Sequence, residues 1–430
     1  MRLPPAPADA SRDVCAGPTY SPGPRRRALL GAGAAGALLL AGCDLSFRDG
    51  VANRCEPEVS AALRDDPRVR AARQGIDAAK VWDTHCHVFG DGDSGSGLWF
   101  NPRMSRVTNP QEYVRRKIYI NAACIDDRPG RIDESFVAHL VAQCRAMPAG
   151  FKALLFAFDW ARDEAGTPMR EMSTYYASDE HLAALAARYP ENFEWVASVH
   201  PYDPRALDRL DAAVARGARA IKWLPSAQNI DPASPRCDAF YAKLAALGLP
   251  LITHAGDEQA VVGFGEHLGN PLRLRRPLDA GVRVVVAHCA SLGHGEELNG
   301  QPASGQPSNF DLFVRMMDEP RHRANLYGDI SAVVQSNRVD VLDTLLSRRE
   351  WQPRLLNGSD YPLPGVVPLI DLRKLVGRGL LDAKMVDPLR DLRHANVLMF
   401  DFVLKRSLAY KGQTFAPGVF ETAPFFAAKG

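Results

Sequence analysis

Short apolar runs alternate with amphipathic stretches along most of the 430-residue chain. Eight of the runs are rich in β-branched or aromatic residues, a composition typical of buried strands. They begin near residues 81, 151, 193, 218, 249, 282, 324 and 354. Between most of them, apolar residues recur at helical spacing, and Gly or Pro ends several of these stretches. The pattern predicts strands and helices in alternation.

Eight strands, most followed by a helix, predict a (β/α)8 TIM barrel of the α/β class, with an open doubly wound sheet as the alternative. Eight units in roughly 330 residues fit the barrel better. We expect the barrel at 81–411, a helical lead-in at 44–80 and an irregular tail at 412–430. The segment RRKIYINAACIDD (115–127) could add one strand, and PLRDLRHANVLMFDFVLKR reads as the last helix.

Ionisable residues accumulate at the carboxyl ends of the expected strands. A parallel barrel strand is buried on both flanks, so a polar residue at its end is informative. The carboxyl ends of barrel strands also meet at the face where active sites are built. The residues in question are His85, His87, His200, Lys222, His254, His288 and Asp360.

The stretch VWDTHCHVFG holds two of them, and alone it is ambiguous. His85 and His87 could be metal ligands, polar neighbours of a redox-active or metal-binding cysteine, or ordinary strand residues. Residues i and i+2 share one face of a strand, so both imidazoles should point into the barrel mouth while Cys86 points away. With His254 and Asp360 at the same face, the four form a nitrogen and oxygen set that suits a divalent metal with an open position.

The other cysteines and histidines have simpler interpretations. Cys86 and Cys289 each neighbour a candidate histidine and should be small core residues that face the helices. Five further histidines fall in expected helices or loops and should be solvated: His139, His181, His267, His294 and His322. The cysteines after residue 43 include no CxxC pair, and their spacing does not reveal a disulfide pairing.

Six segments together resemble the amidohydrolase-related family of the amidohydrolase superfamily, whose members are metal-dependent barrel hydrolases and decarboxylases. The segments are DTHCH, GARAIKWLPSAQNIDP, LPLITHAG, VVVAHC, NGSDYP and HANVLMF. The resemblance runs from about Val81 to Phe400. It departs from the family in the closing segment, where Val397 follows Asn396 directly.

The resemblance implies one divalent metal ion, most often zinc, with four ligands: His85, His87, His254 and Asp360. It places His288 where family members contact metal-bound water, substrate or a second metal. Lys222 stands where binuclear relatives carry a carbamylated lysine between two metals, an arrangement ranked below a single ion. His200 is a further candidate for a second metal or for substrate. Relatives often form dimers, which makes a homodimer an additional expectation.

The lead hypothesis is hydrolysis of a small ester, lactone or amide. Bound zinc lowers the pKa of its water to near 7 and polarises a carbonyl. Asp360 would act as general base and then protonate the leaving group, while His288 would stabilise an oxyanion or assist proton transfer. Lys222 could hold a substrate carboxylate. Candidate pocket-lining residues are Trp99, Arg170, Trp223 and Tyr361.

Two other functions stay open. A decarboxylase of the same fold would use the metal and His288 on a carboxylated substrate. A non-catalytic barrel could serve as a surface binding protein. Such a protein would not need to keep all four metal ligands. The intact set argues for an enzyme.

The N-terminus bears on where the protein works. PRRRALLGAGAAGALLLAGC has a basic run and then an apolar run too short to span a bilayer as a stable helix. Its end resembles a bacterial lipobox, and its arginines resemble a twin-arginine signal. We expect a signal peptide at 1–43, lipidation at Cys43 and a membrane-anchored lipoprotein of the periplasm or cell envelope. An ordinary secretory leader or an uncleaved anchor is the alternative.

Charge adds little beyond this segment. The formal net charge is +2, and the five arginines in the first 42 residues account for the excess. The remainder of the chain is close to neutral, and it has no basic patch that would indicate nucleic-acid binding. The expected partner is a small-molecule substrate.

Overall fold

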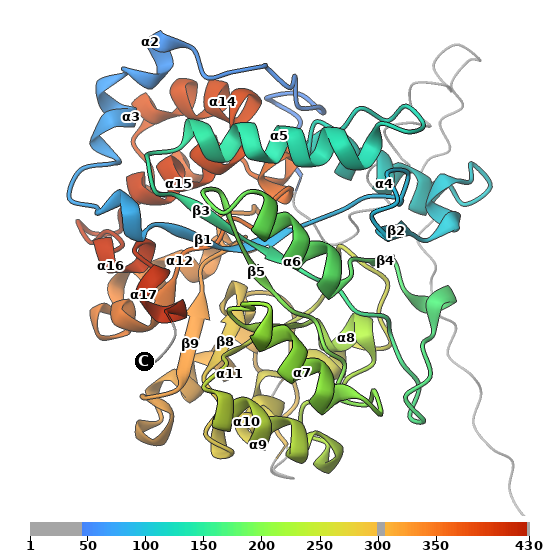
Figure 1. Cartoon of the computed structure of the whole chain (residues 1–430). Helices are drawn as coiled ribbons and strands as arrows, with labels where there is room; N and C mark the ends of the chain where they lie inside the picture. The colour runs from blue at the N-terminus through green and yellow to red at the C-terminus, as the bar shows by residue number, and fades with distance from the viewer. Residues whose placement is uncertain (1–44, 299–305, 428–430) are drawn as a thin grey trace, which may run out of the picture.

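A computed structural model describes residues 45–298 and 306–427. Within these ranges, eight parallel strands form a barrel at the centre of the molecule (Figure 1). They are β1 (Trp82–His87), β3 (Lys152–Phe156), β5 (Phe193–Val196), β6 (Ile221–Trp223), β7 (Leu251–His254), β8 (Val284–Ala287), β9 (Leu326–Asp329) and β10 (Leu355–Leu356). Every apolar run singled out in the sequence forms one of these strands, and the (β/α)8 barrel is confirmed.

The strands follow one another around the barrel in chain order. Ladders join β1, β3 and β5 in one sheet and β6 to β10 in another. Two single bridges close the ring: Ala197, just after β5, pairs with Ile221 of β6, and Tyr361, after β10, pairs with Cys86 of β1. At the second junction, the Thr84 N–H donates to the Asn357 carbonyl (3.1 Å) and the His87 N–H to the Tyr361 carbonyl (3.0 Å). The barrel therefore closes beside the histidine pair.

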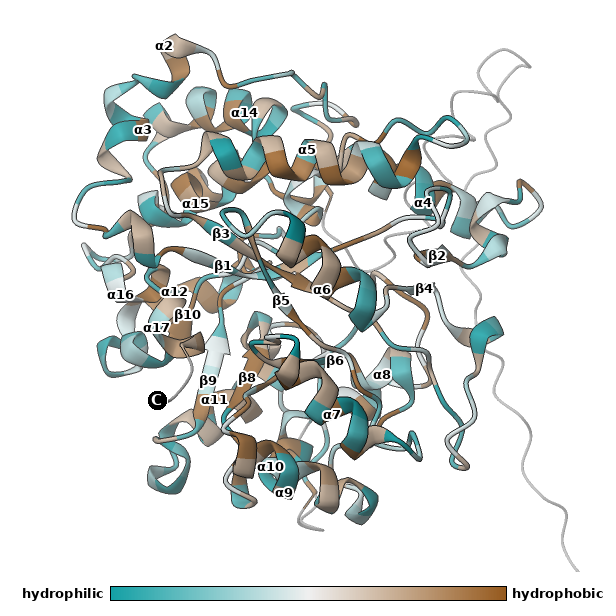
Figure 2. Ribbon diagram, in the orientation of Figure 1, coloured by the Kyte–Doolittle hydropathy of each residue, from teal (hydrophilic) through white to brown (hydrophobic). Residues whose placement is uncertain are grey.

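Helices cover the outside of the barrel (Figure 1). Those that follow β1 to β9 include α5 (Ile132–Ala146), α6 (Asp179–Arg188), α7 (Ala206–Ala215), α9 (Asp238–Leu247), α10 (Arg275–Asp279), α11 (Asn309–Asp318) and α12 (Leu342–Ser347). Figure 2 shows them as mixtures of brown and teal residues, whereas β8 is brown. Each helix buries its apolar stripe and leaves the polar residues outside.

The segment 115–127 does not form the additional strand considered above. Most of it lies in α4 (Pro110–Ala122), which begins with Pro at the first helical position. Its buried residues include Arg116, Tyr119, Ile120 and Ala122, at the three- and four-residue spacing of a helix face. Helical periodicity outweighs the strand propensity of the short KIYI run.

The expected last helix is two helices, α14 (Val386–Ala395) and α15 (Val397–Ser407). Asn396 separates them in an extended conformation, and its side chain accepts a hydrogen bond from the Met399 N–H (2.8 Å). Asparagine is a preferred N-cap because its side chain satisfies a backbone donor that has no helical partner.

The tail is more regular than the sequence suggested. It contains α16 (Pro417–Phe420) and α17 (Ala423–Phe426). Phe426 is buried in a cluster with Leu154, Ile252 and Val285, which come from the barrel strands β3, β7 and β8. Phe426 is therefore part of the barrel core.

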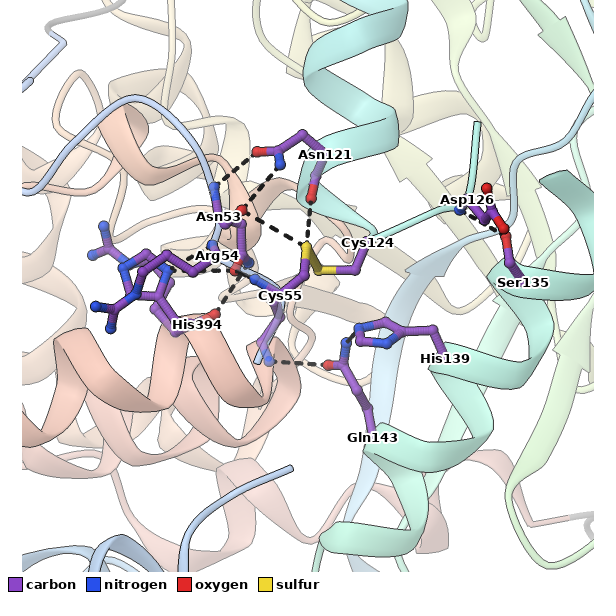
Figure 3. The surroundings of a disulfide bond; sticks show 12 residues. Asn53, Arg54, Cys55, Asn121, Cys124, Asp126, Ser135, His139, Gln143 and His394 are labelled. Atoms are coloured by element: carbon purple, nitrogen blue, oxygen red, sulfur yellow. Dashed lines mark hydrogen bonds between the residues drawn. A yellow bond between two sulfur atoms is a disulfide. The ribbon is translucent and has the colours of Figure 1, made fainter. Parts of the chain in front are cut away.

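The lead-in contains two short helices, α2 (Ala61–Arg64) and α3 (Pro67–Ala71). A disulfide between Cys55 and Cys124 ties it to the end of α4, with 5.5 Å between the two Cα atoms (Figure 3). Asn53 and Asn121 exchange hydrogen bonds beside it, of 2.8 Å and 3.0 Å. The expected signal peptide and Cys43 lie outside the described residues. In the described part, no helix is both long and apolar enough to cross a membrane.

Candidate metal centre

The strand ends open into a pocket with about 850 Å³ of space, including its mouth. Its walls are largely apolar and include Phe89, Ile118, Leu224, Val261, Leu363, Val366 and Leu369. Its polar side chains include His85, His87, Lys222, His254, Glu258, His288, Arg338 and Asp360. The structure thus brings together all the strand-end candidates except His200.

His85, His87 and Asp360 form the tightest group in the pocket. Both histidines project from β1 to the same side, as their spacing requires, and their Nε2 atoms lie 3.2 Å apart. Asp360 Oδ1 lies 3.4 Å from His85 Nε2 and 3.3 Å from His87 Nε2. One ligand atom from each residue lies within 4.8 Å of the other two. Three donors at this spacing can surround one cation.

The NGSDYP segment after β10 places Asp360 in this group. A Cβ at Gly358 would lie 2.6 Å from the His85 Cβ, so only glycine allows the segment to approach β1 this closely. The Asp360 N–H donates to the His85 carbonyl (2.9 Å). Asp360 itself has a φ of 65°, a conformation that is uncommon outside glycine and that concentrates at functional sites.

Asp329, at the end of β9, fixes the orientation of His85. Its Oδ2 lies 2.6 Å from His85 Nδ1, and both side chains are buried. A carboxylate there keeps the proton on Nδ1 and turns the Nε2 lone pair toward the group of ligands. Burial raises the pKa of Asp329, whereas hydrogen bonds from Ser331 and the charges of Lys405 and Lys222 favour its carboxylate form. Burial and the nearby Lys222 lower the pKa of His85 well below its usual value.

Sequence reasoning missed Asp329, although the signal was present. Asp329 lies in the run ANLYGDISA, at the end of the expected strand, and a polar residue at a strand end is the same signal that identified the other candidates. Asp329 is fully buried on the wall of the barrel.

His87 is oriented by a neutral partner. The Tyr175 hydroxyl, from β4 (Tyr175–Tyr176), lies 3.1 Å from His87 Nδ1. β4 pairs with β2 (Trp99–Phe100), so the loops after β1 and β3 together position this tyrosine. Burial raises the pKa of Tyr175 well above its usual value and lowers that of His87. Both groups are therefore uncharged at neutral pH.

His254, at the end of β7, faces the same pocket but lacks such a partner. Both of its ring nitrogens are buried without a hydrogen bond, and Nε2 lies 3.3 Å from Glu258 Oε2. Burial, and then the Arg338 charge, lower the pKa of His254 well below its usual value. A buried, neutral imidazole without a partner fits a metal ligand, because a buried polar group otherwise costs stability.

His288 has one free nitrogen that faces Asp360. Its Nδ1 lies 2.8 Å from Ser331 Oγ and 3.2 Å from the Ser331 carbonyl, an acceptor that assigns the proton to Nδ1. Its Nε2 lies 4.0 Å from Asp360 Oδ2. Burial and then Arg338 lower the pKa of His288 well below its usual value. His288 therefore presents an unprotonated Nε2 to the pocket.

Lys222 lies at the bottom of the pocket. Its Nζ is 3.3 Å from His85 Nε2 and 4.8 Å from the centre of the Phe156 ring. Burial lowers the pKa of Lys222 to about 8, although Asp329 and Asp360 favour its charged form. At neutral pH the side chain is therefore mostly charged, with a minority in the amine form.

The expectation that His200 binds a second metal or substrate is wrong. Its Nε2 donates to the Gln228 carbonyl (2.8 Å) and its Nδ1 accepts from the Tyr202 N–H (3.1 Å). Both nitrogens are thus used by the backbone, and the ring does not line the pocket. The run FEWVASVHP continues past the four residues of β5, so His200 lies beyond the ring of strand ends.

Other expectations about side chains are settled by burial and packing. Cys86 and Cys289 are buried in the core as expected. None of the four speculative lining residues, Trp99, Arg170, Trp223 and Tyr361, lines the pocket. Trp223, for example, packs against Phe240 on the helical side. His322, expected in solvent, is only 1% exposed.

The donors fit a divalent metal. Three buried imidazoles that burial keeps neutral and one carboxylate form a nitrogen and oxygen set of the kind that binds zinc with an open position. His85, His87 and Asp360 lie close enough to hold it together, and His254 lines the same pocket.

Comparison with known proteins agrees with this description. A family model described as amidohydrolase matches residues 82–376. Among solved structures, an uncharacterized TIM-barrel protein from Bordetella bronchiseptica is 16% identical, over 75% of this chain and 99% of that chain, with a TM-score of 0.44. 4-Oxalomesaconate hydratase from Rhodopseudomonas palustris is 14% identical, over 65% and 82%, with a TM-score of 0.38.

A third solved structure is 2,6-dihydroxybenzoate decarboxylase complexed with 2,6-dihydroxybenzoate. It is 13% identical, over 74% of this chain and 98% of that chain, with a TM-score of 0.37. A search of curated proteins found no match.

Proposed function

Because the chain belongs to the amidohydrolase family, we propose that it is a metal-dependent hydrolase that acts on a small ester, lactone or amide. The family consists of metal-dependent hydrolases and decarboxylases, so the chain is an enzyme and the hypothesis of a non-catalytic binding protein is set aside. One observation supports the reaction most strongly: His85, His87 and Asp360 converge within 4.8 Å in an apolar pocket.

Zinc is the ion that we propose for the site, held by these three residues and His254. When bound, it supplies an activated water and polarises a substrate carbonyl. A carbamate on Lys222 between two metals remains the second arrangement, and the number of ions per chain distinguishes the two.

The two oxygens of Asp360 face different neighbours. Oδ1 lies between the Nε2 atoms of His85 and His87, whereas Oδ2 is turned toward His288 Nε2 at 4.0 Å. Oδ1 can therefore act as ligand while Oδ2 accepts a proton from the attacking water and later returns it to the leaving group.

In this scheme the unprotonated Nε2 of His288 accepts a hydrogen bond and so orients the attacking water beside Asp360. Since its Nδ1 proton is directed to the Ser331 carbonyl, its Nε2 has a lone pair and no proton to donate. This favours assistance in proton transfer over the alternative that neutral His288 stabilises an oxyanion. Lys222 is the cation that can take an oxyanion or a substrate carboxylate.

Decarboxylation is the second candidate, favoured by one observation. Lys222 and Arg338 both line a pocket whose walls are mostly apolar, and either can bind a carboxylate near Asp360. Release of carbon dioxide from aromatic or dienoic acids would favour this reaction over hydrolysis.

Metal analysis and a substrate screen test the proposal. The purified full-length protein should contain about one zinc-like ion per chain and hydrolyse at least one member of an ester, lactone and amide panel. Asp360→Asn should abolish that activity. A protein without metal, whose activity no added divalent ion restores, would refute the proposal.

We also propose export to an oxidising compartment, with an anchor at Cys43. The Cys55–Cys124 disulfide supports export, because such bonds persist in the periplasm and are rare in the cytosol. Cell fractionation should find the wild type in the membrane fraction and Cys43→Ala in the soluble envelope fraction. Recovery of both from the cytosol would contradict export.

A further inference from the structure

The loop after β7, residues 255–265, covers part of the pocket. Four of its residues, Glu258, Gln259, Ala260 and Val261, line the pocket wall. The loop is attached to segments that follow other strands: the Tyr119 hydroxyl donates to the Ala260 carbonyl, and the Val262 N–H donates to Thr174 Oγ1 (3.1 Å). The loop is therefore a wall of the site in this conformation.

Glu258 is the acidic residue that this loop directs inward. Its side chain is 8% exposed, and its Oε1 accepts a hydrogen bond from the Ala260 N–H (2.5 Å). Its own N–H donates to Glu266 Oε2 (2.8 Å), which fixes the backbone at this point. The second oxygen, Oε2, is left to face His254 Nε2 at 3.3 Å.

His254 Nε2 and Glu258 Oε2, although 3.3 Å apart, do not form a hydrogen bond. His254 has no hydrogen bond on either ring nitrogen, although the residue is only 2% exposed. A nitrogen donor and a carboxylate oxygen that face the same buried space are the arrangement expected of two ligands of one cation. An ion pair between them would instead require a charged imidazole in a buried position, which desolvation disfavours.

We propose that Glu258 is an additional metal ligand, and that the metal thereby fastens the 255–265 loop over the pocket. The inference rests on the proposed function, because it requires a metal at His254. It adds a ligand from a loop to a set that otherwise comes from strand ends. It also implies that metal occupancy and loop order change together.

Competition with a chromophoric chelator tests the ligand role. Metal-free full-length protein would be titrated with zinc as wild type, as Glu258→Gln and as Glu266→Gln. The first substitution keeps the size of the side chain but removes its charge, whereas Glu266→Gln weakens the backbone contact of Glu258 and leaves its carboxylate in place. We expect zinc affinity to fall about 10- to 100-fold in Glu258→Gln, and to change by less than about twofold in the control.

Hydrogen exchange gives a second readout that needs no variant. Zinc should slow exchange in the peptide that spans residues 257–265 of the wild type, and should fail to do so in Glu258→Gln. Equal zinc affinity in wild type and Glu258→Gln, or an unchanged wild-type loop on zinc binding, would overturn the inference. If the wild type binds no zinc at all, the proposed function fails instead, so the two failures are distinguishable.

Discussion

The two sides of the metal centre are built differently. On the strand side, His85 and His87 each have Nδ1 engaged, by Asp329 at 2.6 Å and by Tyr175 at 3.1 Å. On the other side, called the loop side here, His254 at the end of β7 faces Glu258 of the 255–265 loop. Neither ring nitrogen of His254 has a hydrogen bond. The strand side is therefore oriented before any metal arrives, whereas the loop side needs the metal to complete it.

This difference has a physical basis. A hydrogen bond to Nδ1 fixes both the tautomer and the ring orientation, so the ligand loses little freedom when the metal binds. A loop residue loses conformational entropy when the metal binds. This loss weakens the affinity for the metal but allows the loop to open when the metal leaves. On the strand side, three variants separate the ligand from its orienting partners, and their effects should decrease from the ligand to the charged partner and then to the neutral partner.

Loss of a strand-side ligand should have the largest effect. His87→Ala removes one of the three donors that lie within 4.8 Å of one another, so zinc content and hydrolytic activity should fall below detection. Far-UV circular dichroism should be unchanged, because the alanine still fits the strand. His267→Ala, at an exposed position on the same face, is the matched control and should retain both properties. Activity in His87→Ala would remove His87 from the ligand set.

Loss of the charged orienting group should have a smaller effect. Asp329→Asn keeps the shape but removes the carboxylate from His85 Nδ1, and an amide can present either a donor or an acceptor there. We expect metal affinity or kcat/KM to fall about 10- to 100-fold. Chelator competition and steady-state kinetics measure the two quantities. Unchanged values in both would mean that β1 alone orients His85.

Loss of the neutral orienting group should cost less again. Tyr175→Phe removes only the hydroxyl 3.1 Å from His87 Nδ1 and keeps the ring packed on Phe158. Neutral hydrogen bonds are about half as strong as charge-assisted ones, so zinc affinity should fall less than in Asp329→Asn. The same chelator assay measures it. A larger loss than in Asp329→Asn would reverse the ranking of the two partners.

The sequence was sufficient for the histidines and the aspartate at the strand ends, and insufficient for their hydrogen-bond partners and for the loop. Alternating apolar runs located all eight strands, and the two-residue spacing of His85 and His87 placed both on one face because strand geometry is regular. Glu258 was not foreseen, because the path of an irregular loop depends on contacts such as Val262 with Thr174, which no local pattern encodes.

Partners far apart in the sequence were equally inaccessible. The Cys55–Cys124 disulfide joins the lead-in to the end of a helix, and the spacing of the cysteines does not specify it. Asp329 ends an apolar run, so the strand-end argument applies to it as well, although an aspartate in such a run can also be structural. The same ambiguity led to the wrong assignment of His200.

Substitution of His200 should have the smallest effect on the metal site, and it serves as a reference for the three variants above. Burial lowers its pKa from 6.5 to about 4, while the unfolded chain keeps the ordinary value. Above pH 6.5 the residue is neutral in both states and has no pH-dependent effect. As the pH falls toward 4, the unfolded state binds the proton first, so the fold loses stability.

Between pH 7.5 and 5, wild type should lose about 2 kcal/mol of unfolding free energy through His200. His200→Gln does not titrate, so its unfolding free energy from urea titrations should decline less over this range by about that amount. Its zinc affinity and kcat/KM at pH 7.5 should match the wild type, because both ring nitrogens bond to the backbone of Gln228 and Tyr202 and the ring lies outside the pocket. Loss of zinc in this variant would mean that His200 contributes to the metal site, as His85 and His87 do.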